Sequence, residues 1–477
     1  MPQAMDKQVT SRPRGHILTN TAVWSSDSRW IVYDTRSDRE GSVFDARTIE
    51  RVNVETLQVQ RLYESRRGAC CGVATCHPRA DQVVFIHGPE EPTPEWTYGA
   101  SRRRGVIADA PPVDAASSPR PDGADPATAK AASSARSDAT QPATADAART
   151  PRLQNLDARD LAPPFTPGAL RGGTHVHVYS PDGQFVSFTY EDEVLARLEK
   201  SPDPPADAEL NQRNVGVTVL GRPVQAPKTH ARNHDGVGFS VLVTRTVNRP
   251  RPGSDEISRA CEEGWVGQDG YVRRDGRRQK RALAFQGQVT LGDGRQVCEV
   301  FVADLPEDLT VAGDGPLEGT PTRRPAPPRG VVQRRLTDTS RRAHPGIQGV
   351  RHWLRSSPDG QWIAFLMLDD EGVVQLWLVS PTDGRLRQLT RNRHHVASAF
   401  SWSPDGRHIA HVMNGRVCLS DAATGRTEPL TAPAPPDRAP LPLACVFSPD
   451  GRKIAYQRPV ETGGRPFNQV FVVRLEG

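Results

Sequence analysis

The tetrapeptide Ser-Pro-Asp-Gly occurs four times in the chain and decides its fold. The copies are Ser180–Gly183, Ser357–Gly360, Ser403–Gly406 and Ser448–Gly451. Each copy has the residues that a type I turn prefers, with Pro second and Gly last. An apolar run follows the turn, as in Phe185–Phe188 after the first copy. Each copy therefore predicts a tight hairpin turn between two strands.

The spacing of the last three copies predicts a circular repeat. Pro358 and Pro404 are 46 residues apart, and Pro404 and Pro449 are 45 apart. This is the period of a four-stranded propeller blade. At this point the chain resembles the TolB-like propeller repeats. We therefore predict an all-β fold over residues 1–477, a single seven-bladed β-propeller. Six blades is the alternative, if the weakly patterned fourth repeat is only an elaborated loop.

The two ends of the chain complement each other. Gln8–Thr10 matches the fourth-strand ending at Gln388–Thr390, although no blade precedes it. Gln469–Val473 reads as a third strand, and no fourth strand follows it. We therefore expect the N-terminal segment to complete the last blade, which would remove the unpaired edges of the array.

Two segments depart from the repeat. Residues 109–152 consist mainly of Ala, Ser, Asp, Pro and Thr without an aromatic residue, so a disordered insert is expected there. Residues 250–282 are expected to form an insertion in blade four, with a short helix from Ser254 to Gly264. Glu262 and Glu263 would lie on this helix, mostly as solvated surface. Phe239–Val243 is expected to be the second strand of the same blade.

Composition narrows the class of function. Lys and Arg number 61 against 56 Asp and Glu, and the one basic run, Arg273–Arg281, is expected to be a solvated loop rather than a nucleic-acid interface. The sequence has no run of 18 apolar residues, so we expect a cytoplasmic protein without a membrane segment. Seven cysteines without a C-x-x-C pair indicate neither a disulfide framework nor a zinc knuckle.

Histidines point to a candidate site. Nine of the 13 lie in segments that lead into the first strand of a blade, and in a propeller such segments open on one face around the central channel. His175 and His177 alternate along one strand, so both imidazoles are expected on the same side. His344 and His352 would add two nitrogens, and Gln348 an amide oxygen. Such donors suit a divalent manganese, zinc or iron ion.

Arginines beside these histidines suggest the ligand. Arg171 and Arg351 would each hold a carboxylate through two hydrogen bonds. The predicted ligand is therefore an acidic small molecule or a uronate-type saccharide. Three interpretations of the histidines stay open: a metal site, a polar pocket without metal, and a purely structural role. The alternative function is a non-catalytic scaffold that binds a protein or peptide over the propeller face, with exposed aromatic and apolar residues on one rim.

Stretches from end to end resemble the YidR-type family of bacterial proteins of unknown function. They are His16–Thr21, Thr48–Asn53, Phe85–Glu90, Leu170–Tyr179, Gly253–Gly267 and Pro325–Thr337. This resemblance implies a fold and almost no function. A more distant similarity is to the oligogalacturonate lyases, which are seven-bladed propellers with a channel metal held by histidines. It implies β-elimination as the reaction if the chain is an enzyme, but their ligand motif does not align here, so no catalytic residue is assigned.

Overall fold

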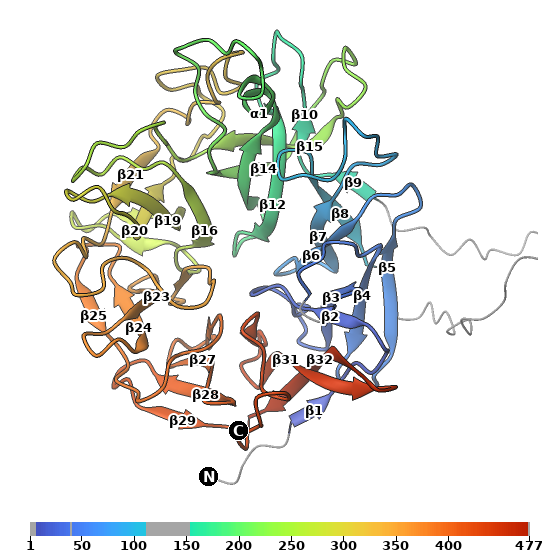
Figure 1. The fold of residues 1–477 in the computed structure, drawn as a ribbon, viewed down its shortest axis with the longest axis vertical. Helices are drawn as coiled ribbons and strands as arrows, with labels where there is room; N and C mark the ends of the chain where they lie inside the picture. Colours follow the sequence, from blue (N-terminus) through green and yellow to red (C-terminus); the bar gives the residue numbers. More distant parts are fainter. Residues whose placement is uncertain (1–5, 39–40, 111–152, 476–477) are drawn as a thin grey trace, which may run out of the picture.

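Seven four-stranded antiparallel sheets form a ring in the computed structural model, which describes residues 6–38, 41–110 and 153–475. Each sheet is one blade, and the strand nearest the centre of the ring comes first in blades one to six (Figure 1). The seven-bladed prediction is confirmed, and the six-bladed alternative is wrong because the fourth repeat forms a complete sheet.

The strands of the seven blades follow in chain order. Blade one has β2 (Gly15–Ile17), β3 (Trp30–Arg36), β4 (Thr48–Asn53) and β5 (Val59–Glu64). Blade two has β6 (Cys71–Cys76), β7 (Gln82–His87), β8 (Arg104–Asp109) and β9 (Leu153–Asn155). Blade three has β12 (Gly172–Tyr179), β13 (Phe185–Asp192), β14 (Asn214–Val224) and β15 (Gly236–Leu242). Blade four has β16 (Ala260–Trp265), β19 (Ala282–Thr290), β20 (Gln296–Asp304) and β21 (Val332–Arg335).

The remaining blades are more regular. Blade five has β22 (Arg355–Ser356), β23 (Ile363–Leu368), β24 (Val374–Val379) and β25 (Leu386–Gln388). Blade six has β26 (Ser401–Trp402), β27 (His408–Met413), β28 (Arg416–Asp421) and β29 (Thr427–Pro429). Blade seven has β30 (Cys445–Phe447), β31 (Lys453–Thr462), β32 (Arg465–Arg474) and β1 (Asp6–Gln8). Outside the blades lie the pairs β10 (Ala158–Arg159) with β11 (Ala169–Leu170) and β17 (Tyr271–Val272) with β18 (Arg278–Gln279), and helix α1 (Glu193–Leu198).

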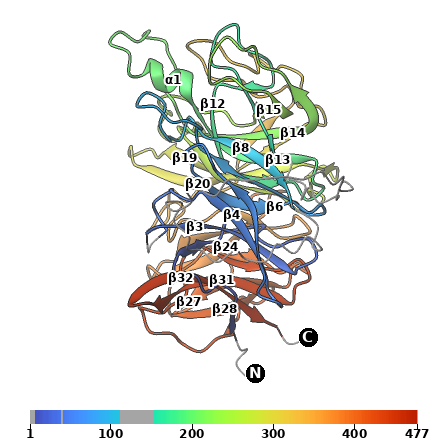
Figure 2. The same ribbon diagram turned by 90° about the vertical axis from the view of Figure 1, so that its right-hand side faces the viewer.

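The Ser-Pro-Asp-Gly turns connect the first two strands of their blades, as predicted. In each turn the Ser hydroxyl donates to the Asp carboxylate, for example over 2.6 Å from Ser357 to Asp359, and the Gly adopts a left-handed φ of 70–75°. These turns and those between third and fourth strands define one face of the ring, here called the turn face. The connections between second and third strands, and between blades, define the opposite loop face (Figure 2).

The N-terminal segment completes blade seven, so the predicted closure is confirmed. Strand β1 pairs with β32 and becomes the outer strand of that sheet (Figure 1). The pairing continues through Val9, whose amide donates to the Val470 carbonyl over 2.9 Å. On the inner side of the ring, the Trp24 indole of blade one donates to the Val446 carbonyl of blade seven over 3.0 Å.

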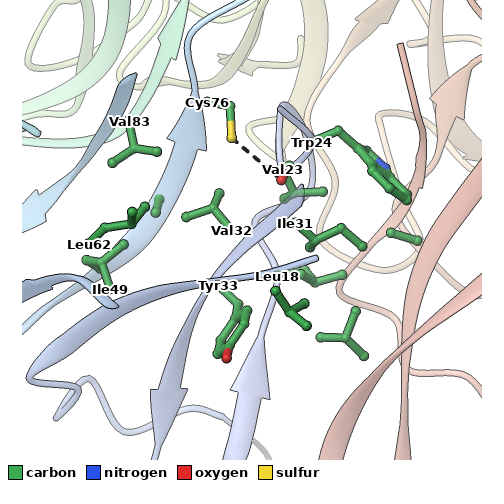
Figure 3. Packing of buried hydrophobic residues seen from close by; sticks show 14 of the residues in the cluster. Leu18, Val23, Trp24, Ile31, Val32, Tyr33, Ile49, Leu62, Cys76 and Val83 are labelled. Atoms are coloured by element: carbon green, nitrogen blue, oxygen red, sulfur yellow. Dashed lines mark hydrogen bonds between the residues drawn. The ribbon is translucent and has the colours of Figure 1, made fainter. Parts of the chain in front are cut away.

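A continuous core backs this closure. Val9, Val470 and Val472 belong to the same buried cluster as Leu18 and Ile31, which joins blades one, two and seven. Figure 3 shows part of this cluster, to which β3, β4, β5 and β7 all contribute side chains. Among the described residues, no helix is long and apolar enough to cross a membrane.

Blade four corrects two predictions. The segment expected to be a helix contains β16 instead, whose register pairs Ala260 with Gly287 of β19. The local cap signals are overridden because the blade needs an inner strand, and pairing with β19 supplies it. Phe239–Val243 lies almost wholly in β15, the outer strand of blade three, and not in blade four. Asp109 ends β8, and the rest of the predicted disordered insert, from 111 to 152, lies outside the described residues.

Candidate functional site

Bulges in three inner strands shape the centre of the ring. Strands β6, β12 and β16 each shift register at an equivalent place. The first residue of each bulge has a left-handed backbone: Val73 (φ 57°), Val176 (φ 54°) and Glu262 (φ 52°). A non-glycine residue in this region costs roughly 1–3 kcal/mol, so the surrounding fold must hold it there. A bulge changes the direction in which the following side chains point. The three bulges therefore determine which residues of these inner strands lie toward the loop face.

The bulge at Val176 separates the two histidines that were expected to act together. The ring of His177 is fully buried between blades two and three, where Nε2 lies 2.9 Å from the Thr174 hydroxyl and a Cβ added to Gly105 would lie 2.8 Å from it. His175 precedes the bulge and has 8% exposure, with no hydrogen-bond partner for Nδ1. The alternation rule fails here because the strand is not regular.

The other predicted ligands have structural bonds. His352 is buried, its Nδ1 donates to the Val350 carbonyl over 2.8 Å, and its Nε2 accepts from the Leu366 amide over 3.0 Å. Gln348 donates to the Pro345 carbonyl and accepts from a backbone amide of β23. His344 is half-buried beside Gly372, in the connection into blade five. These side chains orient the entry of blade five.

Arg171 is not available to a ligand. Its side chain has no exposed surface, and its Nε and Nη2 donate to the Asp192 carboxylate over 3.0 and 2.8 Å. The remaining donors bind the carbonyls of Thr320 and Arg323. The predicted role in carboxylate binding is wrong because this guanidinium ties β12 to the loop before β21.

The residues do not fit the metal that the sequence suggested. Within the described ranges, no group of three or more His, Cys, Asp or Glu side chains is placed to hold a metal ion. His352 uses both ring nitrogens in bonds to the backbone, and His177 points into a blade interface.

Two predicted residues, His175 and Arg351, do come together on the loop face. Arg103, Arg213 and Arg351 are the cations that act on the charge of the His175 ring. They come from three different connections, which precede β8, β14 and β22. We call His175 and these three arginines, with Glu191 and Glu262, the rim cluster.

The rim cluster carries more positive than negative groups. Arg351 pairs with Glu262 over 2.9 Å, and Arg213 pairs with Glu191 over 2.6 Å. Arg103 donates to the Tyr98 hydroxyl over 3.2 Å, and its Nε has no partner. The Arg351 side chain is 57% exposed, so it reaches solvent at the mouth of the ring. The arrangement leaves guanidinium donors for an anion.

An aromatic ring lies beside the exposed arginine. The Arg351 guanidinium lies 4.5 Å from the centre of the half-buried Trp353 ring. The Trp353 indole nitrogen is buried and has no hydrogen-bond partner. Such a cation–π contact fixes the long Arg351 side chain in one orientation before a ligand arrives.

Burial and the neighbouring cations keep His175 neutral. Loss of solvation and the charges of Arg103, Arg213 and Arg351 lower its pKa well below the usual value. A protonated imidazole would add a fourth positive charge to the same small region. At neutral pH the ring is therefore uncharged beside three cations.

Deeper in the ring, a second set of polar residues closes the centre. Arg355 of blade five donates to the side chain and the carbonyl of Asn20 in blade one. These blades are not neighbours, so the contact crosses the centre of the ring. Glu263 is fully buried there and accepts from the Thr189 hydroxyl over 2.9 Å, while its second oxygen has no partner.

Burial raises the pKa of Glu263 to about 7. The folded protein then holds a proton that the unfolded chain releases near its ordinary value, so this stabilisation is complete at low pH and is lost as the pH rises through 7. A Glu263→Gln variant should gain stability relative to wild type between pH 5 and pH 8, by on the order of 2–3 kcal/mol. Urea unfolding at both pH values measures this.

The exposed Glu307 is the control for this experiment, because its side chain is 87% exposed. Glu307→Gln should show no comparable change with pH. A difference between Glu263→Gln and wild type that stays constant from pH 5 to pH 8 would contradict a neutral carboxylic acid at this position.

Sequence reasoning missed four members of the rim cluster. Arg103, Arg213 and Glu191 lie near long connections. No local sequence pattern shows where such a connection returns to the ring. Glu262 was expected on a solvated helix, but it is 5% exposed and lies in β16. One sequence feature did point to this cluster: Arg351 lies directly before a histidine in the segment that leads into blade five.

The predicted scaffold alternative requires exposed aromatic and apolar residues on one rim. The exposed large apolar side chains of the described residues are valines and leucines from several blades: Val43, Leu57, Leu153, Leu210, Val247, Val272, Val311 and Val332. None is aromatic, so the rim cluster is the stronger candidate.

The fold and this cluster define a seven-bladed β-propeller with a cationic centre on its loop face. The chain belongs to the YidR family: it is 44% identical over 454 residues to the uncharacterized protein YidR of Escherichia coli K12, and the match covers 94% of each chain. Residues 70–122 and 139–234 also match the family described as "Protein of unknown function (DUF3748)".

Solved propellers share the fold at low identity. An oligogalacturonate lyase in complex with manganese has a TM-score of 0.53 and 10% identity, covering 100% of this chain and 94% of that one. An oligogalacturonate lyase from Vibrio parahaemolyticus has a TM-score of 0.49 and 8% identity, with coverage of 100% and 94%. The first of these structures confirms the expected similarity to oligogalacturonate lyase for the fold.

Proposed function

We propose that the protein binds an acidic small molecule of the uronate-saccharide type at the rim cluster. The observation that carries this proposal is the convergence of three arginines from three connections on one neutral, buried histidine. The fold shared with an oligogalacturonate lyase makes an acidic oligosaccharide the first ligand to test.

The arginines supply the recognition of a carboxylate. Guanidinium groups bind carboxylates through two parallel hydrogen bonds, and hydrogen bonds to charged groups contribute about 1.5–3 kcal/mol each. Arg351 is the most exposed of the three and exchanges part of its contact with Glu262 for the ligand. Trp353, held beside it, offers an apolar edge to the sugar ring.

The same groups support β-elimination as the reaction. A guanidinium that neutralises the carboxylate lowers the cost of removing the proton from the adjacent carbon. The neutral His175 imidazole takes that proton, the electron pair forms a carbon–carbon double bond, and the bond from the next carbon to the leaving oxygen breaks. A water molecule protonates the leaving oxygen, and the hydroxide that remains takes the proton from the His175 imidazolium, which restores the neutral base. Apart from this water, each step uses residues of this chain.

An Arg351→Ala variant should bind trigalacturonate at least about tenfold more weakly than wild type, because one charge-assisted pair of hydrogen bonds is lost. Isothermal titration calorimetry measures the dissociation constant, and ultraviolet absorbance detects an unsaturated product. Arg295→Ala is the matched control, since Arg295 is a 59% exposed arginine in a loop-face connection outside the cluster.

The outcomes separate binding from catalysis. Binding that Arg351→Ala weakens and Arg295→Ala does not supports the site, and an absorbing product that disappears in His175→Ala supports elimination. No binding of trigalacturonate by the wild-type protein, with or without added manganese, would overturn the proposal.

A further inference from the structure

A groove opens on the turn face between blades five and six, opposite the rim cluster. Its volume is about 320 Å³, and it lies between the turns that contain Asp359 and Asp405. Trp362 and Trp402 line it together with Arg387. A volume of this size is within the range of small-molecule sites.

Among the Ser-Pro-Asp-Gly turns, only those of blades five and six place one tryptophan opposite another. Trp362 follows the turn of blade five, and Trp402 precedes the turn of blade six. The second residue after each turn is Phe185, Trp362, His408 or Lys453. The residue before each turn is Tyr179, Ser356, Trp402 or Phe447. The repeat itself therefore does not require two tryptophans, because the other turns fold with different residues at these positions.

Both indoles are half-buried and held in place. The Trp402 indole donates to the Arg355 carbonyl over 2.9 Å, which fixes its ring across the blade interface. The Trp362 ring has the guanidinium groups of Arg385 and Arg387 at 5.0 and 5.7 Å from its centre. These contacts leave apolar ring surface in the groove at little cost in side-chain entropy.

The polar groups of the groove are equally fixed. One oxygen of Asp359 accepts from the Ser357 hydroxyl over 2.6 Å and from the Gln361 amide over 3.0 Å. Asp405 makes the same pair of bonds in the next turn. Arg387 donates to the carbonyls of Ala422 and Ala423 over 2.6 and 3.1 Å. Each carboxylate thus presents its second oxygen in a defined direction.

The chemistry of the groove selects against charged ligands. The charges of its two carboxylates and of the two arginines on Trp362 offset each other, so neither an anion nor a cation gains a net attraction. Hydroxyl groups donate to carboxylate oxygens, and the apolar face of a sugar ring covers an indole. We propose that this groove binds an uncharged saccharide, independently of the rim cluster.

The test uses two neutral probes, cellotetraose and maltotetraose, which differ in the configuration of their linkages. One of them should bind with a dissociation constant below about 1 mM in calorimetry and change the tryptophan fluorescence. Trp362→Ala should weaken this binding at least about tenfold, since aromatic anchors dominate such sites. His408→Ala, the equivalent position of blade six, should leave it unchanged.

Two further variants keep the test decisive. Gln361 is exposed and lines the groove, so Gln361→Ala folds normally and should weaken binding by about threefold through a lost hydrogen bond. Arg351→Ala should bind the neutral probe as wild type does, which separates this groove from the rim cluster. Failure of both probes to saturate at about 10 mM would overturn the proposal. So would equal binding by Trp362→Ala, or binding of a proline decapeptide in place of the sugars.

Discussion

An Arg171→Ala variant should lose about 3–5 kcal/mol of its free energy of unfolding, because it breaks a buried ion pair from one side. Arg171 has no exposed surface, and its pair with Asp192 is 2.8 Å long. In the variant the Asp192 carboxylate stays buried, and the Tyr190 hydroxyl at 3.0 Å is one of the few donors left to it. Urea unfolding of variant and wild type measures the loss.

The loss should spread beyond the ion pair. The other oxygen of Asp192 accepts from the Leu195 amide over 2.9 Å and so caps helix α1. Arg171 also holds the loop that contains Thr320 and Arg323 through their carbonyls. Hydrogen exchange of α1 and of this loop should therefore accelerate in the variant.

Arg197→Ala is the matched control for this prediction. Arg197 pairs with Glu193 over 2.8 Å, but its side chain is 49% exposed. Glu193 is buried, but it keeps its bonds to Ser101 and Arg102 when the exposed Arg197 is removed, so the loss should cost less than about 1 kcal/mol. If Arg171→Ala were as stable as wild type and instead lost affinity for trigalacturonate, Arg171 would bind the ligand, as the sequence had suggested.

Local turn chemistry explains why the fold could be predicted. The hydroxyl of Ser357 and the carboxylate of Asp359 bond to each other within four residues, so the turn is encoded where it forms. Counting strands between such turns was then enough to assign the closure, because Gln469–Val473 lacked an outer partner and Gln8–Thr10 lacked a blade.

The site could be predicted only in part because its geometry is not local. A regular strand would have placed His175 and His177 on one side, but the bulge at Val176 requires a left-handed backbone in a β-branched residue. No sequence pattern favours that conformation, since the surrounding sheet imposes it. Arg103 and Arg213 reach the same centre from separate connections, and only the closed ring brings them together.

The prediction of a helix in blade four was wrong for a related reason. Ser254 and Gly264 are good helix boundaries, and Asp255 and Glu256 suit the first turn of a helix. The segment nevertheless forms β16, because an unpaired inner edge of β19 would leave backbone donors without partners in the ring. The hydrogen bonds between β16 and β19 thus outweighed the local preference of the segment for a helix.

Removal of residues 1–10 should destabilise the whole ring, by on the order of 5 kcal/mol. Val9 is 4% exposed and packs in the core shared by blades one, two and seven. The Thr10 hydroxyl donates to the Gln469 side chain over 2.8 Å and accepts from the Val470 amide over 2.9 Å, and both groups are buried. Strand β32 would also become an unpaired edge. We expect a lower melting temperature and a concentration-dependent dimer.

Two controls make this prediction specific to the closing strand. A protein that lacks only residues 1–5 should melt at the wild-type temperature, since it keeps β1, Val9 and Thr10. A synthetic peptide of residues 1–12, added to the shortened protein, should restore the melting temperature and suppress the dimer by pairing with β32. The bonds from Val9 and Thr10 cross the gap between the two ends of the chain, so the peptide can supply them without a covalent link. A shortened protein that melts at the wild-type temperature, or that does not respond to the peptide, would show that the Trp24 contact with blade seven and the shared core hold the ring closed without β1.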